Sequence, residues 1–221
     1  MKNIGIPEKK PRKRLSPENR RRMILDEAIS FFAEYGFDGS TRQLARHLGV
    51  TQPLIYQYFP SKAELIEAVY QKVFEQRWED EWSNTLADQS TPLVDRLEKF
   101  YTNYCEVIHD PTWMRIYLFA GLRSNEINQK YNPLIEKRII RRICEELRIH
   151  CGLPTHDIHP ITPAEIETVW TLHGGIFYYG VRRYVYKVSV KVSSRQMIRS
   201  AVLTLVNGYE ALVRDAGVAE K

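Results

Sequence analysis

The sequence predicts an all-α protein with a short basic arm, a small N-terminal domain and a larger C-terminal domain. Apolar residues recur at spacings of three and four along most of the 221 residues, as they do on one face of an α-helix. Helix-start signals, in which Ser or Thr precedes Pro or stands three residues before Gln or Glu, open several of these stretches. We expect the arm at 1–15, the first domain at 16–62 and the second domain at 63–221.

The composition predicts a globular protein of the cytoplasm. Hydrophobic residues make up 43% of the chain and charged residues 27%, and no apolar run reaches the length of a membrane span. The first residues, MKNIGIPEKKPRKR, lack the apolar core of a signal peptide, which predicts a cytoplasmic location. The three cysteines have no C-x-x-C spacing, so we expect buried thiols, with a redox-sensing thiol as the alternative.

Residues 40–62, STRQLARHLGVTQPLIYQYFPSK, predict two short helices that meet at Gly49. Leu44 and Leu48 share a face of the first helix, and Ile55 and Phe59 share a face of the second. The predicted caps are Ser40 with Gln43, then Thr51, then Ser61 with Glu64. Three helix starts so close together predict a helix-turn-helix arrangement.

The second of these helices, Gln52 to Tyr58, has a length that suits the major groove of DNA. Seven residues span about 10 Å, and the groove is about 12 Å wide. If Ile55 and Phe59 face the core, the other side chains face outward, where amides and a phenol can pair with base edges. The candidate base-reading residues are Gln52, Pro53, Leu54, Tyr56 and Gln57. A helical hairpin without DNA contact is the alternative.

This segment resembles the DNA-binding domain of the TetR family of transcriptional regulators. The resemblance covers about 16–69 and rests on GFDGSTRQLARHLGVT (36–51) and LIYQYFPSKAEL (54–65). In that family a glycine-containing loop precedes the second helix, an apolar–aromatic pair anchors the third, and a lysine opening the fourth contacts a phosphate. The resemblance implies these roles for Gly36, for Ile55 with Phe59, and for Lys62. Leu54 departs from the family, where small or polar residues are frequent.

Side-chain direction and the resemblance together give the candidate phosphate-binding residues Thr41, Arg42, Thr51, Tyr58 and Lys62. The charge distribution supports a basic DNA-facing end. Residues 1–62 carry 12 Lys and Arg against 6 Asp and Glu, a net charge of +6, whereas the remaining residues carry −1 of the total of +5. Such an excess supplies salt-dependent attraction to phosphates.

Two basic clusters within this end allow two interpretations each. The arm contains Lys9, Lys10, Arg12, Lys13 and Arg14, and it either contacts the DNA backbone or an adjacent minor groove, or is a solvated tail. Three arginines, 20–22, lie in the first turn of a helix, where they oppose the helix dipole. They either contact phosphates or form a solvated face.

Caps, prolines and apolar stripes predict the other helices. We expect them at 17–35, about 62–82, 92–109, 111–122, about 133–150, about 163–187 and about 194–216. Trp78 and Trp82 are expected in the core. The arginines of the fifth of these helices, namely Arg138, Arg141, Arg142 and Arg148, are expected on a solvated outer face. The loop 152–162 contains His156, Asp157 and His159, but these lack the fixed helical spacing that would predict a metal site. No metal and no cofactor are expected.

The last two helices predict a dimer interface. Gly174, Gly175 and Gly180 each cost about 1 kcal/mol relative to Ala inside a helix, so a close approach is expected to require them. Two antiparallel helices from each of two subunits form a four-helix interface, as the resemblance also implies. An intramolecular core alone is the alternative.

Aromatic residues of the second domain predict a ligand pocket. The candidate ligand-binding residues are Tyr101, Tyr104, Cys105, Trp113, Tyr117, Trp170, His173 and Phe177. Because the pocket would be mostly apolar, we expect a small, largely hydrophobic effector. An aromatic stripe that only fills the core is the alternative.

Together these features predict a sequence-specific DNA-binding transcription regulator, a homodimeric repressor that a small-molecule effector releases from a pseudo-palindromic operator in double-stranded DNA. A ligand-independent DNA-binding protein of nucleoid type is the alternative. An enzyme is not expected, since the sequence contains no G-x-S-x-G, H-E-x-x-H, glycine-rich phosphate loop or paired-carboxylate constellation.

Overall fold

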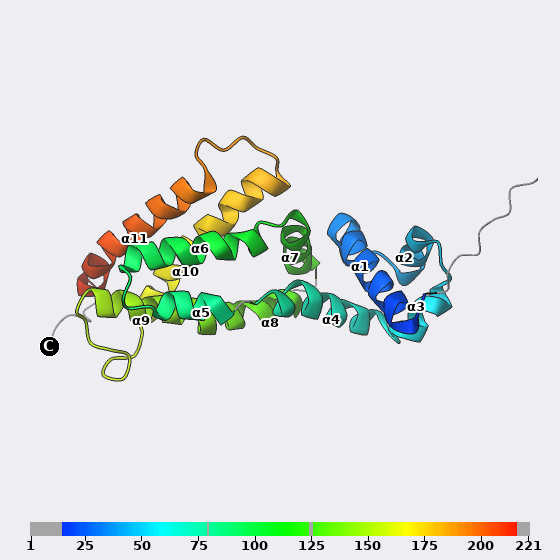
Figure 1. The fold of residues 1–221 in the computed structure, drawn as a ribbon, viewed down its shortest axis with the longest axis horizontal. Helices are drawn as coiled ribbons and strands as arrows, with labels where there is room; N and C mark the ends of the chain where they lie inside the picture. The colour runs from blue at the N-terminus through cyan, green and yellow to red at the C-terminus, as the bar shows by residue number, and fades with distance from the viewer. Residues whose placement is uncertain (1–14, 79, 124–125, 216–221) are drawn as a thin grey trace, which may run out of the picture.

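The computed structural model describes residues 15–78, 80–123 and 126–215, which form helices and connecting turns without a β-strand. Helices α1 (Pro17–Tyr35), α2 (Thr41–Leu48) and α3 (Gln52–Tyr58) lie at one end of an elongated molecule (Figure 1). The other helices are α4 (Lys62–Val73), α5 (Asp80–Ala87), α6 (Leu93–Ile108), α7 (Pro111–Arg123), α8 (Glu126–Ile135), α9 (Arg141–His150), α10 (Pro163–Gly180) and α11 (Ser194–Asp215). None of the described helices is long and apolar enough to cross a membrane.

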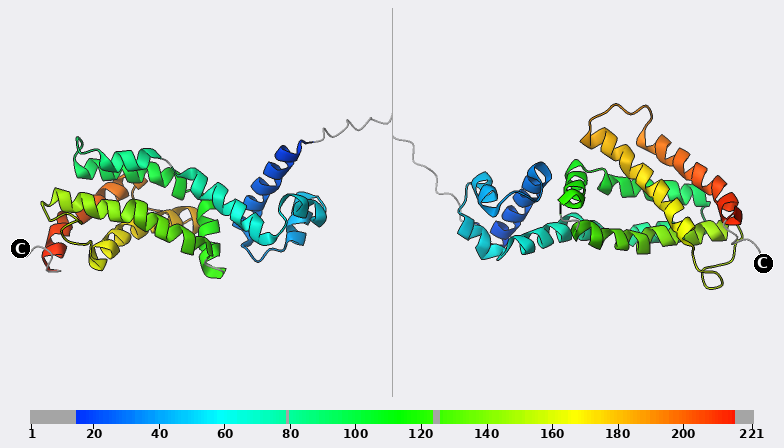
Figure 2. Two further views of the ribbon diagram at one scale, coloured as in Figure 1. Left: turned by 90° about the horizontal axis from the view of Figure 1, so that it is seen from below. Right: turned by 180° about the vertical axis from the view of Figure 1, so that it is seen from behind.

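The N-terminal end carries the helix-turn-helix that the sequence predicts. Helix α4 leads away from it into the body of the molecule, and α10 and α11 run side by side in the part away from α1–α3 (Figures 1 and 2). The Ser40 hydroxyl accepts from the backbone N–H of Gln43, whose side chain accepts from the Ser40 N–H in turn. Gly49 ends α2 in the left-handed region, at φ 63°. Thr51 occupies the predicted N-cap position of α3, but its side chain makes no capping hydrogen bond.

The helix expected from 62 to 82 is two helices. α4 ends at Val73, a 3₁₀ turn spans Glu75–Arg77, and α5 begins at Asp80. Phe74 packs against Trp113, whereas Trp82 packs against Tyr104. In one straight helix, residues 74 and 82 would point about 80° apart. The break therefore lets both aromatic rings enter the core.

The helix expected from 133 to 150 begins at least seven residues earlier, at Glu126. Pro133 lies inside α8, although it lacks the N–H for an intrahelical bond. A π-helical turn, η2 (Glu136–Ile140), joins α8 to α9. Ile127 and Tyr131 are buried, so packing of the segment before the proline outweighs its cost.

The helix expected from 163 to 187 ends earlier. After Gly180 a π-helical turn, η3 (Val181–Val185), follows, and Lys187 has a positive φ of 56°. Gly180 is required within the subunit, because a Cβ there would come within 2.4 Å of the His109 ring. Of α11, expected to 216, the helix is described to Asp215.

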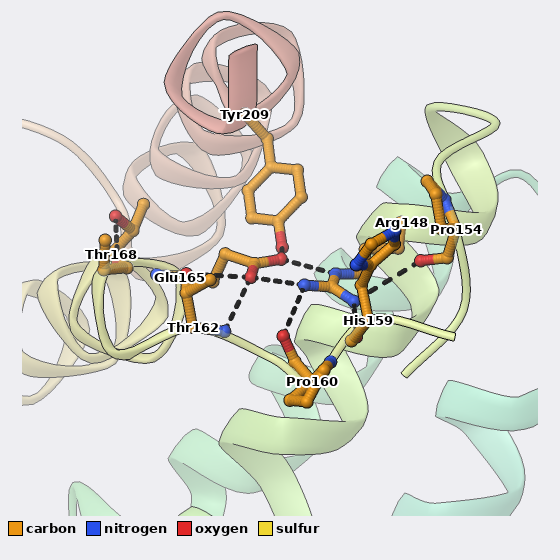
Figure 3. Close-up of polar contacts among 9 residues, drawn as sticks. Arg148, Pro154, His159, Pro160, Thr162, Glu165, Thr168 and Tyr209 are labelled. Carbon is orange, nitrogen blue, oxygen red and sulfur yellow. Dashed lines mark hydrogen bonds and ion pairs between the residues drawn. The ribbon is translucent and has the colours of Figure 1, made fainter. Parts of the chain in front are cut away.

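One expectation about the arginines is wrong, because Arg148 is buried and not solvated. Its guanidinium forms a bidentate ion pair with Glu165, both N···O distances being 2.6 Å (Figure 3). It also donates to the backbone carbonyls of His159 and Pro160. The Tyr209 hydroxyl donates to Glu165 over 2.6 Å, and the N–H of Thr162 over 2.8 Å.

This network joins α9, α10, α11 and the 152–162 loop. Burial alone would raise the pKa of Glu165, but the ion pair with Arg148 and the hydrogen bond from Tyr209 outweigh it and lower the pKa to about 2. The other arginines expected on the outer face are more exposed. Arg142 pairs with Glu146, Arg141 pairs with Glu136, and Arg138 lies over the Trp78 ring.

Candidate nucleic-acid interface and ligand cavity

Helix α3 presents its polar side chains to the outside. Ile55 is the buried residue of this seven-residue helix, and Phe59 follows it in the core. Pro53, Tyr56 and Gln57 are exposed, while Gln52 and Leu54 are half-buried. The five candidate base-reading residues thus lie on one short helix that a hydrophobic anchor holds from behind.

Two of these residues are held by hydrogen bonds to α2. The Gln52 side-chain amide donates to Thr41 Oγ1 over 2.8 Å. The Thr41 and Tyr56 hydroxyls share a hydrogen bond of 2.9 Å. Thr41 itself is only 8% exposed, so in this structure it holds the Gln52 and Tyr56 side chains through these hydrogen bonds. A neutral hydrogen bond contributes about 1 kcal/mol, enough to favour one rotamer of Gln52 and one of Tyr56.

The other candidate phosphate-binding residues occupy different environments. Arg42 and Thr51 are exposed, and Tyr58 is half-buried. The Lys62 ammonium donates to the carbonyl oxygen of Phe37 over 2.5 Å. Since an ammonium group has three donors, Lys62 retains hydrogen-bonding capacity while it fastens the turn before α2 to the start of α4.

The basic surface continues onto α1. The Arg21 guanidinium lies 4.7 Å from the centre of the Phe59 ring, next to the end of α3. Arg22 donates to the Asn19 side chain over 2.9 Å. The basic arm, apart from Leu15, lies outside the described residues. The described part of this end thus combines a helix of amides and a phenol with neighbouring arginines.

A cavity of about 100 Å³ lies between α6, α7, α8 and α10. Six of the residues proposed from the sequence line it: Tyr104, Trp113, Tyr117, Trp170, His173 and Phe177. The other two, Tyr101 and Cys105, are buried but do not line it. The lining also includes Ile108, Tyr131, Asn132, Ile135 and Gly174, which the sequence analysis did not select.

The polar groups around this cavity are incompletely paired. Trp113 Nε1 and His173 Nδ1 are buried and have no hydrogen-bond partner. The Tyr104 and Tyr131 hydroxyls share one hydrogen bond of 3.2 Å. Burial lowers the pKa of His173 to about 4, so the ring is neutral at pH 7. The lining residues include no Asp, Glu, Lys or Arg.

Helix α7 connects the cavity to the N-terminal end. Trp113 and Tyr117 line the cavity, whereas Arg115 and Phe119 face α1. Arg115 donates to the carbonyl oxygen of Ala33 over 2.5 Å and to that of Glu34 over 3.3 Å. The Phe119 ring lies where a Cβ at Gly36 would be 3.2 Å from it. One helix therefore contacts both the cavity and the helix-turn-helix domain.

An outer groove of about 490 Å³ runs along α10 and α11. Its lining is apolar or small, and includes Leu172, Gly175, Ala201, Leu205, Gly208 and Leu212. A Cβ added at Gly175 or Gly208 would meet nothing within 4 Å. The described part of the subunit itself thus leaves space at these two glycines.

The loop before α10 is structural in the described part of the chain. His156 lies near Glu145 and Asp157, at 3.6 and 3.3 Å, and the His159 carbonyl accepts from Arg148. Among the described residues, no group of three or more His, Cys, Asp or Glu side chains is arranged to hold a metal ion.

The N-terminal end of the chain matches a known protein family. Residues 24–69 match the model described as bacterial regulatory proteins, tetR family. The matched range includes the end of α1, all of α2 and α3, and most of α4. The resemblance that the sequence motifs indicate is therefore confirmed over the helix-turn-helix.

Two relatives are transcriptional regulators. The HTH-type transcriptional regulator HbdR of Aromatoleum sp. (strain CIB) is 30% identical over 132 residues, which cover 55% of this chain and 57% of HbdR. The HTH-type transcriptional regulator LuxR of Vibrio harveyi is 32% identical over 81 residues, covering 36% of this chain and 37% of LuxR. The chain thus aligns with less than two thirds of either relative.

The likeness to solved structures extends over most of the chain. SmeT, the repressor of the Stenotrophomonas maltophilia multidrug efflux pump SmeDEF, has a TM-score of 0.57 and 22% sequence identity. The match covers 85% of this chain and 89% of SmeT. At this level of identity, the comparison shows a shared fold.

Proposed function

Since the chain belongs to the TetR family of bacterial transcriptional regulators, we propose that it is a homodimeric repressor of sequence-specific type. The family is one of regulators and not of enzymes. In this proposal a small, largely hydrophobic ligand releases the protein from a pseudo-palindromic operator. The observation that carries it is the exposed, hydrogen-bonded reading surface of α3, backed by the single buried anchor Ile55.

DNA recognition is divided between two kinds of contact in this proposal. Gln52, Tyr56 and Gln57, with Pro53 and Leu54, read base edges in the major groove, because amides and apolar groups suit adenine and the thymine methyl. Thr51, Tyr58, Arg42 and Lys62 contact phosphates. Thr41 contributes by orienting Gln52 and Tyr56.

The second subunit would occupy the groove along α10 and α11. Gly175 and Gly208 line this groove together with apolar side chains such as Leu205, and the two glycines leave room for a close approach of helices. A two-fold axis through this face would place two α3 helices about 34 Å apart or somewhat more, one turn of DNA.

Release by a ligand would use α7. A ligand that prefers one conformation of the cavity shifts the population towards that conformation. Because Trp113 faces the cavity and Arg115 binds the end of α1, a displacement of α7 also displaces the helix-turn-helix domain. The spacing of the two α3 helices in the dimer would change, and operator affinity would fall.

A footprint of the full chain on the DNA upstream of its own and neighbouring genes tests this function. The proposal expects protection of one short pseudo-palindrome and a dimer in sedimentation at micromolar concentration. The nucleoid-type alternative expects protection without preference for sequence. Gly175→Arg should yield a monomer with weakened operator binding. Asn84→Arg, at an exposed position of α5, should leave both the dimer and operator binding unchanged. A monomeric parent protein would overturn the dimer.

A further inference from the structure

The cavity between α6, α7, α8 and α10 has a chemistry that restricts its ligand beyond hydrophobicity. Its volume of about 100 Å³ is smaller than the engineered cavity of about 150 Å³ that binds benzene in another protein. The cavity therefore has room for no more than one ring, and the ligand can extend further only towards an opening. The lining is aromatic on several sides, through Trp113, Tyr117, Trp170 and Phe177.

Two of the incompletely paired groups around the cavity are donors in every tautomer of His173, whose own unpartnered Nδ1 is a donor in one tautomer and an acceptor in the other. An indole N–H is a donor and never an acceptor, and Trp113 Nε1 is buried without a partner. Of the Tyr104 and Tyr131 hydroxyls, one donates to the other, so the accepting hydroxyl keeps its own hydrogen for a third group. Because Trp113, Tyr104 and Tyr131 all line the cavity, these donors are the groups that a ligand acceptor such as a carbonyl oxygen would satisfy.

The uncharged lining disfavours a ligand whose charge lies inside the cavity. A carboxylate would be buried here without a lysine or arginine in the lining, and the desolvation of an unpaired charge is costly. Aromatic rings can stabilise a cation, but a cation would leave the Trp113 N–H and the tyrosine hydrogen unpaired. A neutral His173 adds no charge of either sign.

The opening lies between α8 and α10. Asn132 and Gly174 line the cavity and are exposed, and a Cβ at Gly174 would meet nothing within 4 Å. A surface hollow of about 370 Å³ shares Asn132 and Trp170 with the cavity. The π-helical turn η2 contributes Glu136 and Lys137 to the wall of this hollow. Such turns occur frequently at functional sites.

We propose that the effector is an uncharged compound with one aromatic ring and a hydrogen-bond acceptor, which enters between α8 and α10 and accepts from Trp113. This inference rests on the proposed function, since it names the ligand class of the same cavity. It assigns Trp113 as the residue that distinguishes an acceptor-bearing ring from a plain hydrocarbon.

Calorimetric titration of the full chain with four ring compounds tests the ligand class. The probes are acetophenone, ethylbenzene, benzoate and phenyltrimethylammonium, which share the ring and differ in the attached group. Acetophenone should bind about tenfold more tightly than ethylbenzene, the value of one hydrogen bond, and more tightly than either ion. Tightest binding by benzoate or by the ammonium compound would overturn the proposal.

Two tryptophan variants test the assigned residue. Trp113→Phe should reduce the preference for acetophenone over ethylbenzene, because only the tyrosine donor remains. Continued binding of ethylbenzene shows that the variant is folded. Trp82→Phe is the matched control, because Trp82 also has a buried, unpartnered Nε1 but does not line the cavity. This control should keep the tenfold preference. An unchanged preference in Trp113→Phe would overturn the assignment.

A footprint with and without acetophenone separates this inference from the proposed function. If acetophenone binds as expected and operator protection is unchanged, the ligand class stands and ligand-controlled release fails. If an operator is protected and no probe binds, the ligand class is wrong and the DNA-binding function stands.

Discussion

Two regions of helix α10 treat buried polar groups in opposite ways. At its first turn, Glu165 is fully buried and has partners for both oxygens, among them Arg148 and Tyr209. Two turns further along, His173 lines the same cavity as Trp113, and neither His173 Nδ1 nor Trp113 Nε1 has a hydrogen-bond partner. Both regions lie within the same helix bundle, so burial alone does not distinguish them.

The comparison shows where the chain supplies hydrogen-bond and ion-pair partners for its own buried polar groups and where it leaves such groups unpaired. A satisfied buried ion pair fixes the arrangement of α9, α10 and α11, and breaking it leaves a charge without a partner. An unsatisfied buried donor costs about 1–3 kcal/mol, a cost that a bound acceptor would remove. The Glu165 region therefore maintains the architecture, and the His173 region is the better candidate for binding.

The largest expected effect comes from breaking the ion pair. Arg148→Met should lower the free energy of unfolding by about 3–5 kcal/mol, because Glu165 stays buried without its cation. Urea denaturation measures this change. Arg214→Met is the control, since its pair with Glu210 is exposed and should contribute less than about 1 kcal/mol. Equal losses in the two variants would remove the distinction between the regions.

A matched pair of tyrosines sharpens the comparison. Tyr209 and Tyr101 are both fully buried, but the first donates to Glu165 and the second has an unpartnered hydroxyl. Tyr209→Phe should cost about 1.5–3 kcal/mol, whereas Tyr101→Phe should change stability by less than about 1 kcal/mol. Denaturant titration of both variants checks this; a larger loss for Tyr101→Phe would show a hidden partner.

The two regions should also lose stability in different pH ranges. The pKa of His173 is lowered by burial to about 4 from 6.5, so its contribution is present above pH 6.5 and is lost as the pH falls towards 4. Between pH 7 and pH 5 the loss should be about 2 kcal/mol. Glu165, with a pKa lowered to about 2 from 4.5, loses its contribution as the pH falls from 4.5 towards 2.

Stability curves of His173→Phe and of the parent chain measure the first of these ranges. The variant should lose most of the decrease between pH 6.5 and pH 4.5, where His109, whose pKa is also lowered by burial, contributes the rest. It should keep the decrease below pH 4.5. His156, which is exposed and far from the cavity lining, provides the control substitution His156→Phe. If the parent chain is equally stable at pH 7 and pH 5, the neutral buried imidazole is disproved.

The smallest expected effect concerns the helix-turn-helix. There, Gln52 and Tyr56 form hydrogen bonds within the chain and can form further hydrogen bonds with a bound molecule. Thr41→Val removes the hydrogen bonds to Gln52 and Tyr56, each worth about 1 kcal/mol. Discrimination between operators that differ at one base pair should fall about fivefold. Binding of an operator set with single base changes measures it.

Lys62→Ala is the comparison for that experiment. As a proposed phosphate contact, Lys62 should affect all sequences alike, and its loss should reduce the salt dependence of binding. A change in sequence preference for Lys62→Ala would contradict the phosphate assignment of Lys62. An unchanged sequence preference for Thr41→Val would contradict the role of Thr41 in orienting Gln52 and Tyr56.

Local signals in the sequence predicted much of the fold. Ser40 with Gln43, and Thr162 with Glu165, form the capping boxes that their spacing indicates. The bounds of α1 and α3 agree with the expected 17–35 and 52–58. These features depend on residues a few positions apart, so no tertiary information is needed to find them.

The missed features depend on partners far along the chain. Arg148 has the spacing of a solvated residue, and only Glu165 and Tyr209, 17 and 61 positions later, make it a buried one. Tyr131 was not predicted to line the cavity, because Pro133 indicated that the helix begins after Tyr131. The break near Trp78 has no proline or glycine to announce it and follows from the packing of Phe74 and Trp82.

The short helix α3 has a consequence for how such a protein can change. Ile55 is the one fully buried residue of α3, so the other side chains of this helix do not form part of the fully buried core. If α3 reads base edges as proposed, substitutions at Pro53, Tyr56 or Gln57 alter the preferred DNA sequence while the hydrophobic core keeps its packing. Recognition and stability are separately adjustable here, so a new target site requires no new fold.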